Sequence, residues 1–367
     1  MKHTENIVTA VLWIGVLLIG SVLFFVLPRE TVSLSERRTL AVLPEATAEN
    51  WLNGRYEEAL EPYVEDHFPF REELRRLKAG FLTAVLRQTE SDGIAIRNGE
   101  LCALQTEIHE DSLWHAAGCI RAVYERYLSK SKKIGLAIVP DKGYYWGREG
   151  YPVMDYAAFT EELVGNVPEM TYIDLFGCLD AASYHPTDSH WKQEALGPTV
   201  DRILQGLGNR SAGAVPVSSL QEKTIYPFYG VYAAQAAIGT PPDTLRYYDG
   251  GPLSNVKAFD FETRTGIPLY DEENYDRRDP YTVFLGGAKG LLRIENPDAA
   301  SEEELVIFRD SYASALAPLL APYYRSITLV DTRYVHPDLL GRYIDFSGKT
   351  VLFLYSTLLL NESGALR

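Results

Sequence analysis

The decisive stretch of the chain is residues 304–313, ELVIFRDSYA, in which an apolar run leads into a polar turn and then into a helical pattern. The run at 304–308 is typical of a buried parallel strand, and residues 312–323 predict a helix. Ser311 therefore stands at the end of the strand and beside the positive end of the helix. Both features suit a nucleophile and its oxyanion, although Asp310 or Ser311 as a plain helix cap is the alternative.

Strands and helices alternate on both sides of this stretch. Further strands are predicted at 134–139, 171–175, 282–285, 326–330 and 350–354, and helices at 111–131, 154–163, 190–207 and 336–345. Short connections between such elements imply right-handed crossovers, which build a parallel sheet. We therefore expect an α/β fold with a mainly parallel sheet, in which ligands bind beyond the carboxyl ends of the strands.

The N-terminal part of the chain holds a long apolar run. Ile7–Leu27 contains no charged residue, and as a helix it reaches about 30 Å, the thickness of the hydrocarbon core of a membrane. A cleaved signal peptide is the alternative. The run is longer than the usual apolar core of a signal, and its end lacks the small residues that the peptidase needs. This favours an uncleaved transmembrane anchor at residues 1–28.

The rest of the chain divides into two further parts. Residues 29–50 predict an exposed connector and residues 51–90 predict helices that Pro69 should break, so we expect a connector and helical region at 29–90. Residues 91–367 are expected to form the α/β domain. Within it, residues at about 211–280 hold many Gly, Pro, Asp and Tyr and no long helical pattern, which indicates an irregular, β-rich insertion.

Composition narrows the possible partners and cofactors. The chain carries a formal charge of −15, which disfavours nucleic acid and anionic lipid headgroups as partners of the soluble part. The three cysteines, Cys102, Cys119 and Cys178, have no metal-ligand spacing, and their odd number argues against a disulfide scaffold. The sequence has neither a phosphate-binding loop nor a dinucleotide fingerprint. We therefore expect no cofactor and no metal.

Residues 184–191, YHPTDSHW, form a second candidate cluster. An Asp and a His two residues apart in a loop can point into one pocket, where the carboxylate of Asp188 would orient the imidazole of His190 and stabilise its charged form. The alternative is that Asp188 or Ser189 caps the following helix. Together with Ser311, this cluster supplies all the roles of a Ser-His-Asp site at predicted strand ends.

Several short motifs occur in one order along the chain: Ser35–Ala41, Asp66–Arg71, Val139–Lys142, Thr187–Trp191, Phe284–Gly287, Asp310–Tyr312 and Val330–Tyr334. In this combination the chain resembles the DHHW family of bacterial surface proteins over roughly residues 35–357. That family is related to the SGNH-like periplasmic proteins that O-acetylate alginate.

The resemblance implies an SGNH-like three-layer α/β sandwich with a permuted motif order. Carried over position by position, Ser311 would be the nucleophile, His190 the general base and Asp188 its orienting carboxylate. The Ser would take an acetyl group and pass it to a hydroxyl of a cell-surface polysaccharide. A membrane-bound O-acyltransferase would be the partner, and the soluble domain would lie outside the cell membrane, held by a single span.

The chain departs from the family pattern at two positions. Ser189 replaces a His, and Ala288 stands where an Asn side chain is expected to help bind the oxyanion. The loss of one such donor costs about 3 kcal/mol, unless backbone groups of Gly287 or Ser311 compensate. Lys142 would either place positive charge near the pocket or be a solvated loop residue. His185 and Trp191 are expected as pocket walls or core.

These observations leave three functions open, of which the third is a structural membrane protein whose partner is the acyltransferase itself. The first is an acetyltransferase or acetylesterase that acts on a cell-surface glycan through an acyl-Ser311 intermediate. The second is a non-catalytic glycan-binding or assembly protein on the same fold, which the Ala at position 288 favours. In that case the Tyr-rich residues 224–282 would form the binding surface.

Overall fold

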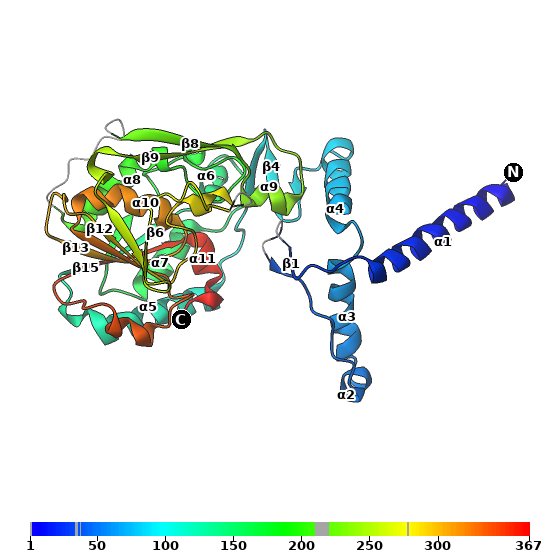
Figure 1. Ribbon diagram of the computed structural model, residues 1–367, viewed down its shortest axis with the longest axis horizontal. Helices are drawn as coiled ribbons and strands as arrows, with labels where there is room; N and C mark the ends of the chain where they lie inside the picture. The colour runs from blue at the N-terminus through cyan, green and yellow to red at the C-terminus, as the bar shows by residue number, and fades with distance from the viewer. Residues whose placement is uncertain (1, 34–35, 37, 210–219, 277–278) are drawn as a thin grey trace. The chain divides into compact units, whose positions relative to one another are not determined.

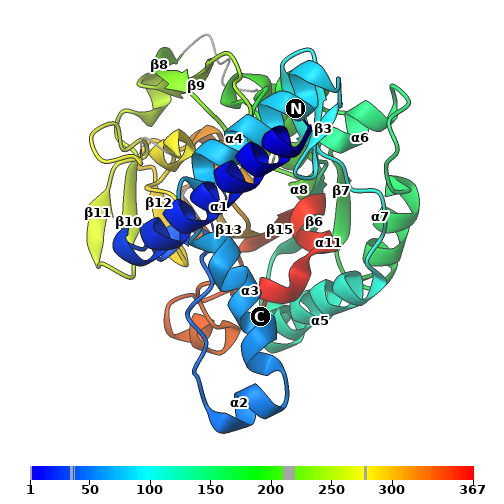
Figure 2. The ribbon, with the colours of Figure 1, turned by 90° about the vertical axis from the view of Figure 1, so that its right-hand side faces the viewer.

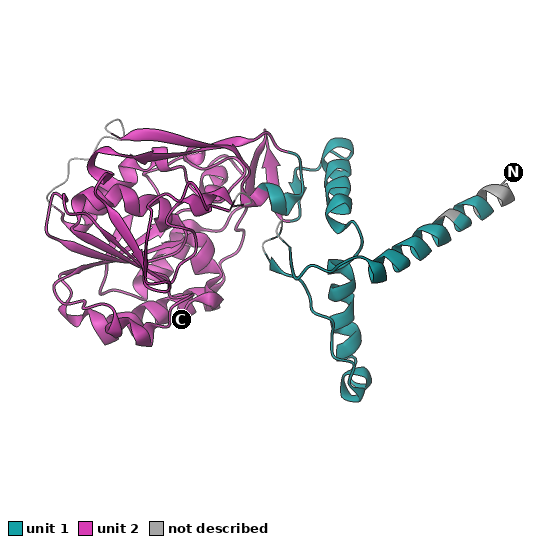
Figure 3. Ribbon diagram, in the orientation of Figure 1, with its two compact units in different colours: residues 1–92, 233–239 teal, residues 93–232, 240–367 magenta. Residues whose placement is uncertain are grey.

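The computed structural model describes residues 2–33, 36, 38–209, 220–276 and 279–367. Its residues form two compact units, shown in teal and magenta in Figure 3. Unit 1 comprises residues 1–92 and 233–239, and unit 2 comprises residues 93–232 and 240–367. The first part of the predicted insertion, residues 211–219, lies outside the described residues, as do Ser35 and Arg37 of the first motif.

Unit 1 is mostly helical. Its elements are α1 (Lys2–Val26), β1 (Val32–Ser33), β2 (Arg38–Thr39), α2 (Ala48–Leu52), α3 (Arg55–Asp66), α4 (Arg71–Gly80), a π-helical turn (Phe81–Val85) and β3 (Glu90–Ser91). The helical region therefore breaks on both sides of Pro69, as predicted, because proline restricts the residue before it and lacks an amide hydrogen.

The first helix carries the predicted membrane segment. Within α1, the stretch Ile7–Val26 has a mean hydropathy of 2.6 and is long and apolar enough to cross a membrane. No residue in the most apolar 18-residue part of this stretch is buried inside the protein. By length and composition alone, such a helix fits either a membrane anchor or a signal sequence.

Unit 2 is built on an eight-stranded sheet of order β11-β10-β12-β14-β13-β15-β6-β7. Figure 2 labels these strands, except β14, in the same order from left to right. The strands are β6 (Lys133–Val139), β7 (Thr171–Asp174), β10 (Lys257–Asp260), β11 (Thr265–Ile267), β12 (Leu291–Glu295), β13 (Glu304–Arg309), β14 (Ser326–Val330) and β15 (Thr350–Ser356). From β14 to β7 all neighbours are parallel, whereas β12, β10 and β11 add antiparallel pairs at one edge.

Helices cover both faces of this sheet. Successive residues of a strand point to opposite faces, so each strand contributes side chains to two cores. Ile307 and Leu352 belong to one core, which they share with α8 (Gly197–Leu207) and α10 (Tyr312–Leu320). Phe308 belongs to a second core with α5 (Glu110–Tyr127) and α7 (Tyr156–Gly165). Figure 1 shows α8 and α10 on one side of the strands and α5 on the other. The predicted three-layer α/β fold with a mainly parallel sheet is confirmed.

Several smaller elements follow, and residues 233–236 of one of them belong to unit 1. They are β4 (Ile94–Arg97), β5 (Glu100–Ala103), α6 (Lys142–Gly147), β8 (Gln221–Phe228), α9 (Val231–Ala236), β9 (Asp243–Asp249) and α11 (Thr357–Asn361). β4 and β5 form an antiparallel hairpin, and β8 pairs with β9. Strands β10 and β11 fall within the predicted insertion at 211–280 but belong to the main sheet.

Three predicted elements differ from the structure. The expected strand at 282–285 is a 3-10 turn, Pro280–Val283, followed by left-handed residues at Leu285 and Gly286 that cannot continue a strand. The helix predicted from His190 starts only at Gly197, since the preceding residues form a loop and a short 3-10 turn. The helix predicted at 336–345 is a 3-10 helix, Pro337–Arg342.

Candidate active site

Ser311 lies where the sequence predicts, between the carboxyl end of β13 and the first turn of α10. The strand ends at Arg309 and the helix begins at Tyr312, so Ser311 is the N-terminal cap residue. Its side chain makes no capping hydrogen bond to α10. The hydroxyl is therefore available for another partner, and the alternative of a plain side-chain cap at Ser311 does not hold.

That partner is His190. The Nε2 atom of His190 lies 2.7 Å from the Oγ atom of Ser311, and the Nδ1 atom lies 2.6 Å from Oδ1 of Asp188. Asp188 is fully buried and His190 is nearly so. The structure thus brings the three predicted residues into one hydrogen-bonded row. In this geometry the imidazole is placed to take the proton of the Ser311 hydroxyl, and the carboxylate is placed to stabilise the resulting imidazolium.

The carboxylate of Asp188 is held by backbone amides. Oδ1 accepts a hydrogen bond from the N–H of His190 at 2.9 Å, and Oδ2 accepts one from the N–H of Val231 at 2.8 Å. Gly230, directly before Val231, lies against the same turn. A β-carbon on Gly230 would lie 2.4 Å from Cβ of Asp188 and 2.3 Å from the carbonyl oxygen of Thr187. The close approach that fixes Asp188 therefore requires a glycine at position 230.

Aromatic rings hold the imidazole and its loop. The ring of Tyr281 stacks on that of His190 with a centroid distance of 4.0 Å and an interplanar angle of 15°. The hydroxyl of Tyr312 donates to the carbonyl of Ser189 at 2.7 Å, and Nε1 of Trp191 donates to the carbonyl of Tyr312 at 3.0 Å. Trp191 is fully buried, so it ties the His190 loop to the start of α10 from within the core.

The two residues before Ser311, Arg309 and Asp310, hold the turn that carries it. The carboxylate of Asp310 accepts hydrogen bonds from the N–H of Tyr312 at 3.1 Å and from the N–H of Ser356 at 2.8 Å. The buried guanidinium of Arg309 donates to Oγ of Ser314 at 3.0 Å and to the carbonyl of Lys289 at 3.3 Å. Strand β15, helix α10 and the loop at 286–290 are thereby joined around Ser311.

Lys142 is buried and is not a solvated loop residue. Its ammonium group donates to the carbonyls of Leu101 at 2.8 Å, His185 at 2.6 Å and Pro186 at 3.2 Å. Burial lowers the pKa of Lys142 to about 8. All three of these partners are main-chain carbonyls, and two belong to the loop that leads to Asp188. Lys142 therefore anchors the active-site loop.

The same loop contains a second histidine, His185, which pairs with Asp243 at the start of β9. Nδ1 of His185 lies 2.7 Å from Oδ2 of Asp243, and the His185 ring packs edge-on against Phe228 with centroids 4.7 Å apart. Burial raises the pKa of Asp243, but the hydrogen bond and charge of His185 outweigh it, so the pKa lies below its usual value. His185 is buried, which agrees with its prediction as wall or core.

The loop expected to supply oxyanion donors is Leu285–Gly290. Gly287 is left-handed, with a φ of 82°, and its N–H donates to the carbonyl of Phe284 at 3.1 Å. Ala288 is exposed. In the described part of the chain, no hydrogen bond joins either residue to Ser311. Their role in binding an oxyanion stays a prediction, and the N–H of Gly287 is already in use within its turn.

The described residues contain no group of three or more His, Cys, Asp or Glu side chains that could hold a metal ion. The sequence reasoning missed Tyr281 and Asp243. Tyr281 follows a proline in a segment predicted next to a strand, and Asp243 lies 58 residues from His185, so no local pattern points to either.

Fold and site together define a three-layer α/β protein with a Ser-His-Asp row at the strand ends. No family model and no curated protein matches this chain. Among solved structures, it is similar to a DHHW family protein from Eubacterium siraeum DSM 15702. The TM-score is 0.61 and the sequence identity 20%, covering 75% of this chain and 94% of that one.

The chain is also similar to Bacillus cereus PatB1, solved with a sulfonyl adduct. Here the TM-score is 0.57 and the identity 18%, covering 73% of this chain and 95% of PatB1. The O-acetyltransferase domain of Pseudomonas putida AlgJ gives a TM-score of 0.44 at 13% identity, covering 73% and 92%, which is too low to establish a shared fold by itself. The first two similarities confirm, at the level of the fold, the resemblance to the DHHW family.

Proposed function

We propose that this chain is an extracytoplasmic O-acetyltransferase or acetylesterase that acts on a cell-surface polysaccharide through an acyl-Ser311 intermediate. The observation that carries the proposal is the row formed by Ser311, His190 and Asp188, with heavy-atom distances of 2.7 and 2.6 Å. Both distances lie within the hydrogen-bond reach that a nucleophile and its general base need.

In the first half of the reaction, Oγ of Ser311 attacks the carbonyl carbon of an acetyl ester, and its proton passes to Nε2 of His190. The tetrahedral intermediate collapses as the imidazolium returns this proton to the leaving alcohol, which leaves acetyl-Ser311. In the second half, His190 takes the proton of an acceptor hydroxyl as that oxygen attacks the acetyl carbon. The second tetrahedral intermediate collapses as the bond from the acetyl carbon to Oγ of Ser311 breaks and the imidazolium returns the proton to this oxygen. A sugar acceptor gives transfer, whereas water gives hydrolysis.

The proposed location follows from α1 and from the family resemblance. An uncleaved α1 would hold the chain in the cell membrane by a single span, with unit 2 outside. A membrane-bound O-acyltransferase would supply the acetyl group, as expected for a relative of alginate-acetylating proteins. The apolar stretch Ile7–Val26 supports the anchor, because its 20 residues match the hydrocarbon core in length.

The test is covalent labelling of the full chain in detergent micelles. p-Nitrophenyl acetate serves as the acetyl donor and methanesulfonyl fluoride as a trapping reagent, and peptide mass spectrometry locates the added group. We expect acetyl and methanesulfonyl groups on Ser311, with both lost in Ser311→Ala and His190→Ala. A folded wild-type chain that stays unlabelled at Ser311 would contradict the proposal.

A non-catalytic glycan-binding or assembly protein is the second candidate, and Ala288 favours it because an exposed methyl group cannot donate to an oxyanion. The variant Ala288→Asn separates the two functions. If the site is catalytic, the new amide should speed acetylation of Ser311 by up to about a hundredfold. If the protein only binds glycan, neither Ala288→Asn nor Ser311→Ala should change retention on immobilised polysaccharide.

A further inference from the structure

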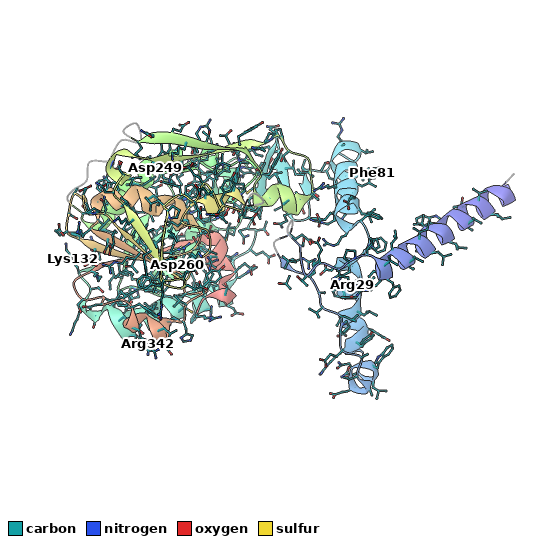
Figure 4. The ribbon with its side chains drawn as sticks, viewed as in Figure 1. Arg29, Phe81, Lys132, Asp249, Asp260 and Arg342 are labelled. Carbon is teal, nitrogen blue, oxygen red and sulfur yellow. The ribbon has the colours of Figure 1, made fainter. Side chains whose placement is uncertain are left out.

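Helix α4 and the π-helical turn that follows it carry a line of exposed apolar side chains. Phe70, Leu74, Leu77, Phe81 and Val85 recur every three or four residues, so they lie along one face of the helix. We call this set the apolar stripe. Its members are between 45% and 70% exposed. Figure 4 labels Phe81 at the end of α4. A row of this length is uncommon on a surface that faces only water.

The residues just before α4 contact the membrane segment. A β-carbon on Gly20 would lie 3.8 Å from the end of the Phe68 ring. Gly20 lies six residues before Val26, the last residue of the apolar span, which corresponds to about 9 Å along a helix. Phe68 is itself 46% exposed. The Phe68 ring, in the turn between α3 and α4, therefore lies beside the apolar span and not beyond its end.

An aromatic and basic cluster marks the end of that span. The rings of Phe24 and Tyr63 meet edge to face with centroids 6.2 Å apart, and the Arg29 guanidinium lies 4.8 Å from the first ring and 5.0 Å from the second. Arg and aromatic side chains of this kind gather at the headgroup level of membranes. Such a cluster suits the end of a membrane span.

The charge of the α4 segment is opposite to that of the whole chain. Residues 71–87 contain five basic and two acidic side chains, whereas the chain carries −15. Lys78 and Arg76 are exposed. Phe70, which begins the stripe, has a left-handed φ of 58°. Such a conformation is unfavourable in a non-glycine residue, although the aromatic ring that it presents is 59% exposed.

We propose that residues 68–86 lie in the lipid–water interface beside α1, with the apolar stripe in the edge of the hydrocarbon and the basic side chains among anionic headgroups. Interfacial helices bury their apolar face by about 5–10 Å, which agrees with the depth that Gly20 gives for Phe68. The inference rests on the proposed anchoring of α1. It assigns to unit 1 a second contact with the membrane, beyond the span itself.

The experiment measures the depth of spin labels in the full chain reconstituted into vesicles of phosphatidylglycerol and phosphatidylcholine. Cys119→Ser and Cys178→Ser remove the partly exposed native thiols, and buried Cys102 is left in place. Single labels are then placed by Leu77→Cys in the stripe, Arg76→Cys on another exposed face of α4, and Val16→Cys in the span. Collision with oxygen reports lipid, and collision with a water-soluble nickel complex reports water.

We expect the label at position 77 to lose collision with nickel and gain collision with oxygen, as at position 16, while the label at 76 stays accessible to nickel. Water exposure at 77 with lipid exposure at 16 would overturn the inference and leave the anchor intact. A label at 77 that neither reagent reaches would show that protein covers the stripe and would also overturn it. Water exposure at both 16 and 77 would refute the anchor and, with it, the inference.

Discussion

Two Asp–His pairs of unit 2 have nearly the same internal geometry, and both of their histidines lie in one loop, at 185 and 190. His190 contacts Asp188 at 2.6 Å, and His185 contacts Asp243 at 2.7 Å. They differ at the far side of the ring. Nε2 of His190 faces the Ser311 hydroxyl at 2.7 Å, whereas the His185 ring packs on Phe228.

In the proposed mechanism, an Asp–His hydrogen bond does not by itself make a base. A pair acquires catalytic chemistry only when a third group with a transferable proton lies within hydrogen-bond reach of the free nitrogen. His185 also accepts Lys142 at its carbonyl, and its own N–H donates to the carbonyl of His190. We therefore interpret the outer pair as the support on which the inner pair rests.

The largest expected effect distinguishes the two carboxylates. Asp188→Asn should lower the rate of Ser311 acetylation by about 10⁴-fold, because the amide favours the wrong tautomer of His190 and cannot stabilise its charge. The matched variant Asp243→Asn should lower the same rate by less than about tenfold. Stopped-flow release of p-nitrophenol measures both. Equal losses in the two variants would show that the pairs do not divide into catalyst and support.

A smaller effect, on the free energy of unfolding, is expected from Lys142, which binds the loop that leads to Asp188. Lys142→Met removes the donor that the carbonyls of Leu101, His185 and Pro186 share, although Pro186 still accepts the N–H of Leu101 at 2.7 Å. Each buried group left unpaired costs about 1–3 kcal/mol. The loss in free energy of unfolding should therefore reach several kcal/mol. Denaturant midpoints followed by the fluorescence of buried Trp146 and Trp191 report it.

The control for this variant is Lys132→Met, which removes an exposed ion pair with Glu303. Such pairs contribute about 0–1 kcal/mol. If both variants shifted the midpoint equally, the assignment of Lys142 as an anchor of the loop would be wrong.

The smallest effect concerns pH. The pKa of Asp243 is lowered in the folded protein, so its pairing stabilises the fold above the unfolded pKa, and this contribution is lost as the pH falls through the folded pKa. The difference in free energy of unfolding between wild type and Asp243→Asn should be constant above about pH 5 and shrink below about pH 4. A difference that grew in acid would contradict the sign of this shift.

The parallel half of the sheet was predictable because its strands are continuous apolar runs. β6, β13 and β15 are buried on both faces, so every position in them selects for apolar side chains. The antiparallel edge was not predictable in the same way. β12 reads Leu-Leu-Arg-Ile-Glu and is buried only in part, and β11 has three residues, so neither has a distinct pattern.

The candidate triad was predictable for a related reason. Parallel strands bring their carboxyl ends to one edge, so polar residues after β13 and in the loop before α8 were expected to converge, although Ser311 and His190 are 121 residues apart. The residues that contact this triad from other segments were not predictable from the sequence. Tyr281 stacks on His190 from the turn at 280–283, part of which the sequence predicts as a strand. The left-handed residues Leu285 and Gly286 cannot continue such a strand, and no distinct sequence pattern marks them.

Gly230 extends the description of the site into evolutionary terms. Its backbone follows no left-handed path, and yet a methyl group there would overlap the turn that carries Asp188. The position should therefore be intolerant of every replacement for want of space alone. In a library of variants selected for acetylation, we expect glycine to be retained at 230 as strictly as the three reactive residues, although it takes no part in the chemistry. Selection on this site would then act in part on a residue that has no side chain.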